Sequence, residues 1–520
     1  MSKAEPVKSL ENWIWDAACS IRGAKDAAKF KDFILPLIFT KRLCDVYDDE
    51  LNRIAKEVGS RAKAFKLVRH DKKLVRFYVP LQPADPEDAV WSVIRKLSDK
   101  IGEGLTSHLR AIADENALLK GIIDRVDFNA TTHGVRDLDD TRLSNLIERV
   151  SEKRLGLDDV EADIIGRSYE YLIRKFAEGG GQSAGEFYTP AEVGEIMARI
   201  MDPEPGMTCY DPTCGSAGLL IKCELFMEEK RYPVGASAKG RKPAPLKLYG
   251  QESEPTTWAM ANMNMIIHDM EGLIEIGDTF RHPKFRKGNR LQTFDRVVAN
   301  PMWNQTEFAE KDYDADELGR FPKGAGFPGN KADWGWVQHI LASLNETGRA
   351  AVVLDTGAAS RGSGNANTNK EKEVRRWFVD HDLIEGVIYL PENLFYNTTA
   401  PGIILFLNKA NPHRGNIFLL NASAEFAKGD PKNYIPAEAV RRIAETFGTW
   451  HEVEKYSRIV TREEIAKNDY NISPSRYIHT GAGEEYRPLE EIVEELDALE
   501  AEARATDKAL RKILEKFLGA

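Results

Sequence analysis

Cysteine and long apolar runs are scarce in this sequence, and each scarcity excludes a class of protein. The five cysteines, Cys19, Cys44, Cys209, Cys214 and Cys223, are odd in number and form no Cys-x-x-Cys pair. Neither a disulfide framework nor a zinc or other metal site is therefore expected. No apolar run approaches the ~18 residues that a membrane span needs, and no signal peptide is apparent. We therefore expect a cytoplasmic protein without a membrane segment.

The chain also lacks the net positive charge that is typical of nucleic-acid-binding proteins. Its formal net charge is −10, which would ordinarily argue against DNA binding. The charge is uneven, however, because residues 51–80 carry nine Lys or Arg side chains and only two acids. Such a basic strip fits phosphate contact within an assembly better than stand-alone DNA binding, and a solvated helical face explains it equally well.

The length of 520 residues predicts two or three domains. Residues 1–155 have apolar side chains at helical spacings and predict an all-helical domain for assembly or DNA contact. Strand and helix patterns alternate over residues 156–480, which predicts an α/β domain, and we expect the functional motifs described below to make it the catalytic domain. Residues 481–520 predict a C-terminal helix that docks on another subunit or, alternatively, on the N-terminal helices. Its seam residues alternate spacings of three and four: Leu489, Ile492, Leu496, Leu499, Ala503, Thr506, Leu510, Ile513 and Phe517.

One short stretch organises the functional interpretation of the chain. The apolar run Val297–Ala299 predicts a buried strand, which Asn300 and Pro301 end. In open α/β sheets, ligands bind at the carboxyl ends of strands. There, the Asn300 oxygen and the Pro301 carbonyl could accept N–H bonds from the exocyclic amine of a base, and Trp303 could stack on its ring. An ordinary Asn-Pro turn with a core tryptophan is the alternative.

A second motif predicts a nucleotide-type strand–turn–helix unit. A strand over residues 207–210 leads into Asp211 and a small-residue turn that contains Gly215, Ser216, Ala217 and Gly218. The two glycines let the backbone approach a ligand closely, but the turn is not the Gly-x-Gly-x-x-Gly fingerprint of dinucleotide sites.

Polar side chains also follow the next two predicted strands. Glu252 follows a predicted strand over residues 246–250 and could take two ribose hydroxyls. Asp278 follows a predicted strand over residues 274–276 and could accept an adenine amine. Upstream, Thr189 and Pro190 predict a helix start, with Pro190 in the first helical position. The free N–H groups of that start suit a carboxylate.

Further strands are expected at residues 350–354, 384–391 and 400–407. The aromatics Phe395 and Tyr396 lie between the last two. They could meet the opposite face of a flipped base, or they could simply pack in the core.

Taken together, the segments Gly185–Pro190, Asp211–Gly218, Glu252, Asp278 and Asn300–Trp303 resemble the amino-methyltransferases of DNA. Their order is similar to that of the gamma class, and their form resembles the modification subunit of type I restriction–modification systems. The resemblance implies an α/β fold with a Rossmann-like S-adenosylmethionine-dependent core, that is, a mostly parallel seven-stranded sheet with an antiparallel strand. It also implies N6 methylation of a flipped adenine in a site-specific manner.

The resemblance assigns roles residue by residue. Asn300, Pro301 and Trp303 match the catalytic Asn-Pro-Pro-aromatic motif, with Met302 where the family usually has a second proline. The residues implied to bind S-adenosyl-L-methionine are Glu186, Phe187, Tyr188, Thr189, Pro190, Ala191, Asp211, Gly215, Ser216, Ala217, Gly218, Glu252 and Asp278.

The implied partners are a specificity subunit, a second modification subunit, a motor-nuclease subunit and double-stranded DNA. The residues between the last predicted strand and the tail are too few for a target-recognition domain, so specificity should come from the separate subunit. Two alternatives remain. One is methylation of a protein glutamine or of RNA, and the other is a non-catalytic scaffold that binds the donor. Cytosine N4 is also open as a target, because its amine demands the same hydrogen bonds.

Overall fold

The computed structural model describes residues 7–21, 30–179, 188–231, 244–365, 369–396, 398–479 and Thr506. The chain divides into two compact units, Met1–Ile478 and His479–Ala520. The predicted heptad helix lies, except for Thr506, outside the described residues, as do Glu186 and Phe187. No helix within the described ranges has the length and apolarity to cross a membrane.

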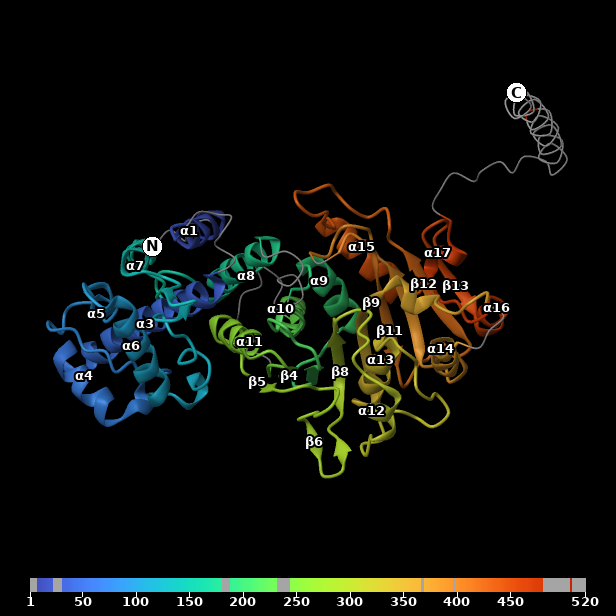
Figure 1. Cartoon of the computed structure of the whole chain (residues 1–520), viewed down its shortest axis with the longest axis horizontal. Coiled ribbons are helices and arrows are strands. Elements are labelled where there is room, and N and C mark those ends of the chain that lie inside the picture. The colour runs from blue at the N-terminus through green and yellow to red at the C-terminus, as the bar shows by residue number, and fades with distance from the viewer. Residues whose placement is uncertain are drawn as a thin grey trace, which may run out of the picture. The chain divides into compact units, whose positions relative to one another are not determined.

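The N-terminal part of the first unit is helical, as predicted, apart from a two-residue hairpin, β1 (Thr131–Thr132) and β2 (Val135–Arg136) (Figure 1). Its α-helices are α1 (Val7–Cys19), α3 (Lys31–Val58), α4 (Arg61–His70), α5 (Ser92–Arg95), α6 (Ile101–Glu115), α7 (Asp140–Ser151) and α8 (Ala162–Gly179). The long helix α3 ends where Gly59 adopts a φ of 91°, a left-handed conformation that favours glycine.

This helical core continues into the α/β part of the first unit, which follows α8. Helix α11 (Pro255–Ile267) contributes Met260, Met263 and Ile267 to the same buried cluster. The helix begins at Pro255, and the Glu254 side chain caps it by accepting from the amides of Thr256 and Thr257. The two parts therefore share apolar packing.

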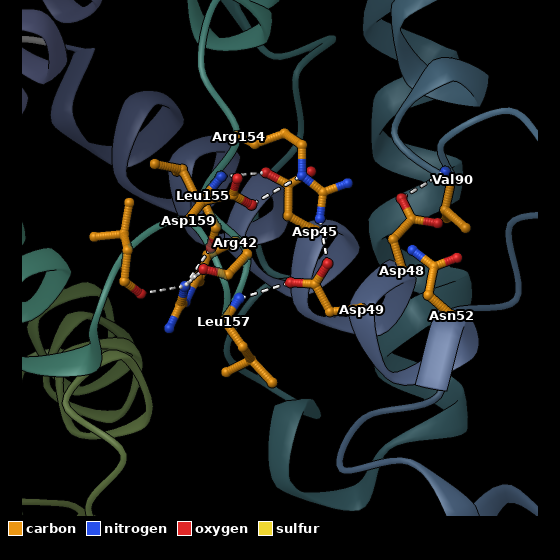
Figure 2. Close-up of polar contacts among 12 residues, drawn as sticks. Arg42, Asp45, Asp48, Asp49, Asn52, Val90, Arg154, Leu155, Leu157 and Asp159 are labelled. Carbon is orange, nitrogen blue, oxygen red and sulfur yellow. Dashed lines mark hydrogen bonds and ion pairs between the residues drawn. The ribbon is translucent and has the colours of Figure 1, made fainter. Parts of the chain in front are cut away.

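Buried charges of α3 hold the connection that leads into α8 (Figure 2). Asp45 accepts from the backbone N–H of Leu155 at 2.7 Å, and Asp49 accepts from that of Leu157 at 2.7 Å. Arg42 donates to three carbonyl oxygens of the same connection. Because charged hydrogen bonds are about twice as strong as neutral ones, they fix a segment that has no regular structure. We call this cluster the α3 junction.

The α/β part is built on one large sheet (Figure 1). Within the described ranges nine strands pair in the order β13-β12-β10-β11-β9-β8-β3-β4-β5. The strands are β3 (Thr208–Asp211), β4 (Lys247–Glu252), β5 (Gly272–Ile276), β8 (Phe294–Ala299), β9 (Leu344–Asp355), β10 (Ile384–Tyr389), β11 (Gly402–Asn408), β12 (Asn416–Asn421) and β13 (Ser457–Thr461). A small hairpin, β6 (Arg286–Lys287) and β7 (Arg290–Leu291), stands apart from it.

The predicted sheet is confirmed and extended. From β5 to β10 it has seven strands, of which β11 alone runs antiparallel to its neighbours. Beyond β10, the parallel strand β12 and the antiparallel strand β13 lengthen the sheet by two.

Helices cover both faces of this sheet, which is why the central strands are apolar on both sides. One face packs against α9 (Ala191–Met201), α10 (Gly218–Arg231) and α15 (Ala437–Gly448). The other packs against α13 (Asp333–Ala342), α14 (Lys370–Asp380) and α16 (Arg462–Lys467). The short helices α12 (Glu310–Asp314) and α17 (Pro474–Tyr477) complete the first unit. In β8, for example, Val298 faces the first layer and Val297 the second.

The strand order reverses at β3. The chain runs from β3 outward to β4 and β5, and then returns so that β8 pairs with the opposite side of β3 in parallel. Such a reversal opens a crevice outside the carboxyl ends of the two central strands. Asp211 ends β3 and Asn300 follows β8, so the fold brings these two predicted residues to the same crevice.

Candidate active site

Two cavities adjoin at this crevice. The smaller, of about 560 Å³, is bordered by the segment from Tyr188 to Ala191 and by the turn after β3. The larger, of about 1100 Å³, is bordered by the carboxyl ends of β4 and β5. Thr213, Gly215 and Asn300 line both cavities, so the two cavities lie on either side of these three residues.

The turn after β3 combines strained backbone with a buried acid. Gly215 has a φ of 52° and Ala217 a φ of 63°, which bends the chain tightly between the strand and α10. Asp211 is 1% exposed and accepts from the Thr213 N–H at 2.9 Å. Burial, helped by the charge of Glu252, raises the pKa of Asp211 to about 8. The turn therefore holds a carboxyl group that is largely protonated near neutral pH.

Two more carboxylates face the larger cavity. Glu252 accepts from the Gly215 N–H at 3.0 Å and from the Glu254 N–H at 2.9 Å. Burial raises the pKa of Glu252, and these backbone bonds oppose that rise. Asp278 accepts from the Phe280 N–H at 2.8 Å and from Arg281 at 3.1 Å. Both carboxylates are thus fixed by the backbone at neighbouring strand ends, where hydroxyl or amine groups of a ligand could reach them.

The loop after β8 is tied to the segment before α9. The Asn300 Nδ2 donates to the Thr189 Oγ1 at 3.0 Å. The start of the next helix differs from the prediction, because Pro190 does not occupy the first helical position. Helix α9 begins at Ala191, Pro190 is the residue before it, and no side chain caps the helix. The Thr189 hydroxyl instead uses its acceptor capacity on Asn300, which leaves the Asn300 carbonyl oxygen to accept from another group.

Trp303 lies against the sheet side of the loop. Its ring meets Phe395 edge-to-face at 4.8 Å, and a Cβ placed on Gly402 would approach it to 3.0 Å. Phe395 is 2% exposed, so it packs in the core. Of the two interpretations of the aromatic pair, packing therefore fits Phe395. Met302, in contrast, is 46% exposed, and Pro301 is buried.

Sequence reasoning missed a charged clamp behind the loop. Arg361 donates to the Asn304 side-chain oxygen at 3.1 Å and binds the carboxylates of Asp355, Glu371 and Asp333. Asp333 in turn accepts from the Asn304 N–H at 3.0 Å. Asn304 has a φ of 58°, an unfavourable conformation for a residue with a side chain, so these bonds hold a strained turn in place. No motif in the sequence marked Arg361 or Asp333.

Most predicted site residues are thus gathered around the two cavities. Those that line the smaller cavity are Tyr188, Thr189, Pro190, Ala191, Asp211, Gly215, Ser216, Gly218 and Asn300. Glu252 and Asp278 line the larger one, and Ala217 is buried. Among the described residues, Pro301 and Trp303 border neither cavity, although Asn300 and Met302 of the same loop do.

Comparison with known proteins gives consistent findings over nearly the whole chain. The N-6 DNA Methylase family matches residues 160–486, and the HsdM N-terminal domain matches residues 10–150. The type I restriction enzyme MjaVII methylase subunit of Methanocaldococcus jannaschii is 31% identical, over 94% of this chain and 80% of the relative. The MjaVIII methylase subunit of the same organism is 36% identical over 70% of this chain and 62% of its own length.

Among solved structures, the type I restriction-modification system methyltransferase subunit from Streptococcus thermophilus is similar with a TM-score of 0.74 at 25% identity. That similarity covers 91% of this chain and 100% of the other.

Proposed function

The chain belongs to the N-6 DNA methylase family, among the type I restriction enzyme methylase subunits, and on that premise we propose that it methylates N6 of an adenine flipped out of duplex DNA, with S-adenosylmethionine as donor. One observation carries the proposal. Asn300, the first residue of the acceptor loop, lines both cavities beside the Gly215 turn and is anchored there by Thr189.

The chemistry of the cavities fits the donor. Carboxylates at successive strand ends suit a nucleoside, so Glu252 would hold the ribose hydroxyls and Asp278 the adenine amine. The segment from Tyr188 to Ala191 and the turn from Gly215 to Gly218 would enclose the rest of the molecule. When bound, S-adenosylmethionine supplies an electrophilic methyl group on its sulfonium. Of the predicted donor-binding residues, Glu186 and Phe187 enter this proposal from the sequence alone.

Asn300 and Pro301 act on the acceptor amine. An exocyclic amine is a poor nucleophile, because its lone pair is delocalised into the ring. The Thr189 contact uses one N–H of the Asn300 amide and turns the nitrogen toward Thr189, and the amide oxygen accepts one N–H of the adenine amine. The Pro301 carbonyl accepts the other, and the two bonds localise the lone pair on nitrogen. By its match to the motif, Trp303 would stack on the extruded base, a contact worth about 1–3 kcal/mol, although among the described residues it borders neither cavity.

The partners follow from the relatives. They are named as methylase subunits of type I restriction enzymes, so this chain works with a specificity subunit, a second copy of itself and a motor-nuclease subunit on double-stranded DNA. We infer the division 1–155, 156–480 and 481–520 for assembly or DNA contact, catalysis and subunit docking, with the family boundaries at residues 150 and 160 as support. The compartment that fits this work is the cytoplasm.

A transfer experiment with three acceptors tests the proposal. The chain, purified with its specificity subunit, is incubated with tritium-labelled S-adenosylmethionine and duplex DNA, RNA or protein. Label should enter the DNA only. Label in RNA or protein would replace the proposal with the corresponding alternative. Donor binding without transfer to any acceptor would identify a scaffold.

A further inference from the structure

A partly buried ion pair borders the smaller cavity, which Asn300 of the acceptor loop also lines. Lys222 on α10 donates to the Glu170 Oε2 on α8 at 3.0 Å, and both residues line the cavity together with Gly215, Ser216 and Gly218. Their side chains are only 21% and 13% exposed. Neither Lys222 nor Glu170 belongs to the motifs that define the acceptor loop and the glycine turn.

Lys222 reaches the cavity along the first turn of α9. A Cβ placed on Gly194 of α9 would lie 3.3 Å from the Lys222 Cγ, so the missing side chain leaves room for the lysine stem. Pro190 and Ala191, at the start of the same helix, also line the cavity. The ammonium group and the positive end of α9 therefore converge on one small volume, which favours an anion.

The pair also keeps capacity for a ligand. A lysine ammonium has three donors, and the Glu170 bond uses one of them. The other oxygen of Glu170, Oε1, lies 3.9 Å from the His268 Nε2, beyond hydrogen-bond distance. Burial alone would raise the pKa of Glu170, but Lys222 and His268 outweigh it and lower that pKa, so the carboxylate stays ionised.

We propose that this pair recognises the amino-acid end of the donor, with Lys222 binding its carboxylate and Glu170 its ammonium. The assignment rests on the proposed donor and adds the part of the site that distinguishes S-adenosylmethionine from a plain nucleoside. Charge supports it, because an ion pair of zero net charge matches a zwitterion of zero net charge without leaving either group uncompensated. A purely structural pair joining α8 to α10 would have no preference among nucleosides.

The test compares two probes by isothermal titration calorimetry on the full chain. S-adenosylmethionine carries the amino-acid end, and 5′-methylthioadenosine lacks it. In Lys222→Met, the Kd for S-adenosylmethionine should rise about 10- to 100-fold, since a charged hydrogen bond is worth about 1.5–3 kcal/mol. The Kd for 5′-methylthioadenosine should stay within about twofold. The matched control is Lys230→Met, which removes an exposed lysine of the same helix that pairs with Asp202.

A double variant, Glu170→Gln with Lys222→Met, guards against misfolding, because it leaves no unpaired buried charge. It should show the same selective loss. Unchanged binding of S-adenosylmethionine in both variants would overturn the assignment, as would an equal loss of both probes. If the unmodified chain bound neither probe, the proposed donor itself would fail, which is a different result from either of these.

Discussion

The α3 junction and the crevice between β3 and β8 both bury ionisable side chains, yet they use them differently. At the junction, Asp45 binds Lys41 and the Leu155 N–H, so its charge serves the chain itself. At the crevice, Asp211 borders a cavity of about 560 Å³. Burial raises the pKa of Asp45 as it does that of Asp211, so a raised pKa does not identify the functional region. The functional region is identified by the open cavity beside the ionisable group.

The largest contrast is expected at Asn300. Asn300→Ala removes the proposed acceptor of the amine N–H, so methyl transfer should fall by about a thousandfold. Donor affinity and the free energy of unfolding should change much less than transfer, because Asn300 contributes a single hydrogen bond, to Thr189, to the donor side of the site. Single-turnover kinetics and calorimetry measure the two effects separately. Transfer at the unmodified rate would refute the role of Asn300.

The junction should show the reverse behaviour. Arg42→Met leaves three carbonyl oxygens without their donor, and the free energy of unfolding should drop by about 3 kcal/mol. Donor affinity of the folded protein should be unaltered. Arg53→Met, on the exposed side of α3, is the control and should change stability by less than about 0.5 kcal/mol. Denaturant titration gives the values, and equal stability of the two variants would contradict a structural role for Arg42.

A change in the clamp behind the acceptor loop should have a smaller effect than either of these two variants. Lysine cannot bind Asn304 and three carboxylates at once, so Arg361→Lys should lower kcat about tenfold and leave the donor Kd unchanged. Arg376→Lys, at an exposed position of α14, should have no effect. A loss of donor affinity in step with kcat would mean that Arg361 supports the whole domain and does not position the loop.

The most gradual change concerns Asp211 in the chain without donor. Its pKa in the folded chain, about 8, lies above the ordinary value of 3.8, so its stabilising contribution is complete below that lower value and is lost as the pH rises to about 8. Asp211→Asn does not titrate and keeps the acceptor for the Thr213 N–H. Between about pH 4 and about pH 8, the variant should gain about 1.4 kcal/mol over the unmodified chain for each pH unit, and nothing beyond. Thermal unfolding across this range tests it, and a pH-independent difference would refute the buried, protonated state.

The sequence was sufficient wherever a local pattern determined the structure. Apolar runs that end in a polar residue predicted β3, β4, β5 and β8, and their carboxyl ends meet at one crevice. The bond from Asn300 to Thr189 could not be predicted in this way, because it joins residues 111 positions apart and depends on how α9 packs. The same holds for Arg361 and Lys222, whose partners lie on other elements. The two added strands, β12 and β13, were not predicted from their apolar residues. The roles of the site residues stay predictions.

The central claim is most directly tested by mapping modified bases in DNA. The chain and its specificity subunit are co-expressed in a host without DNA methylation, and the host DNA is sequenced by a single-molecule method. We expect N6-methyladenine at one recurring split site, absent when Asn300→Ala replaces the unmodified chain. Unmodified adenines throughout, or N4-methylcytosine at the recurring site, would contradict it.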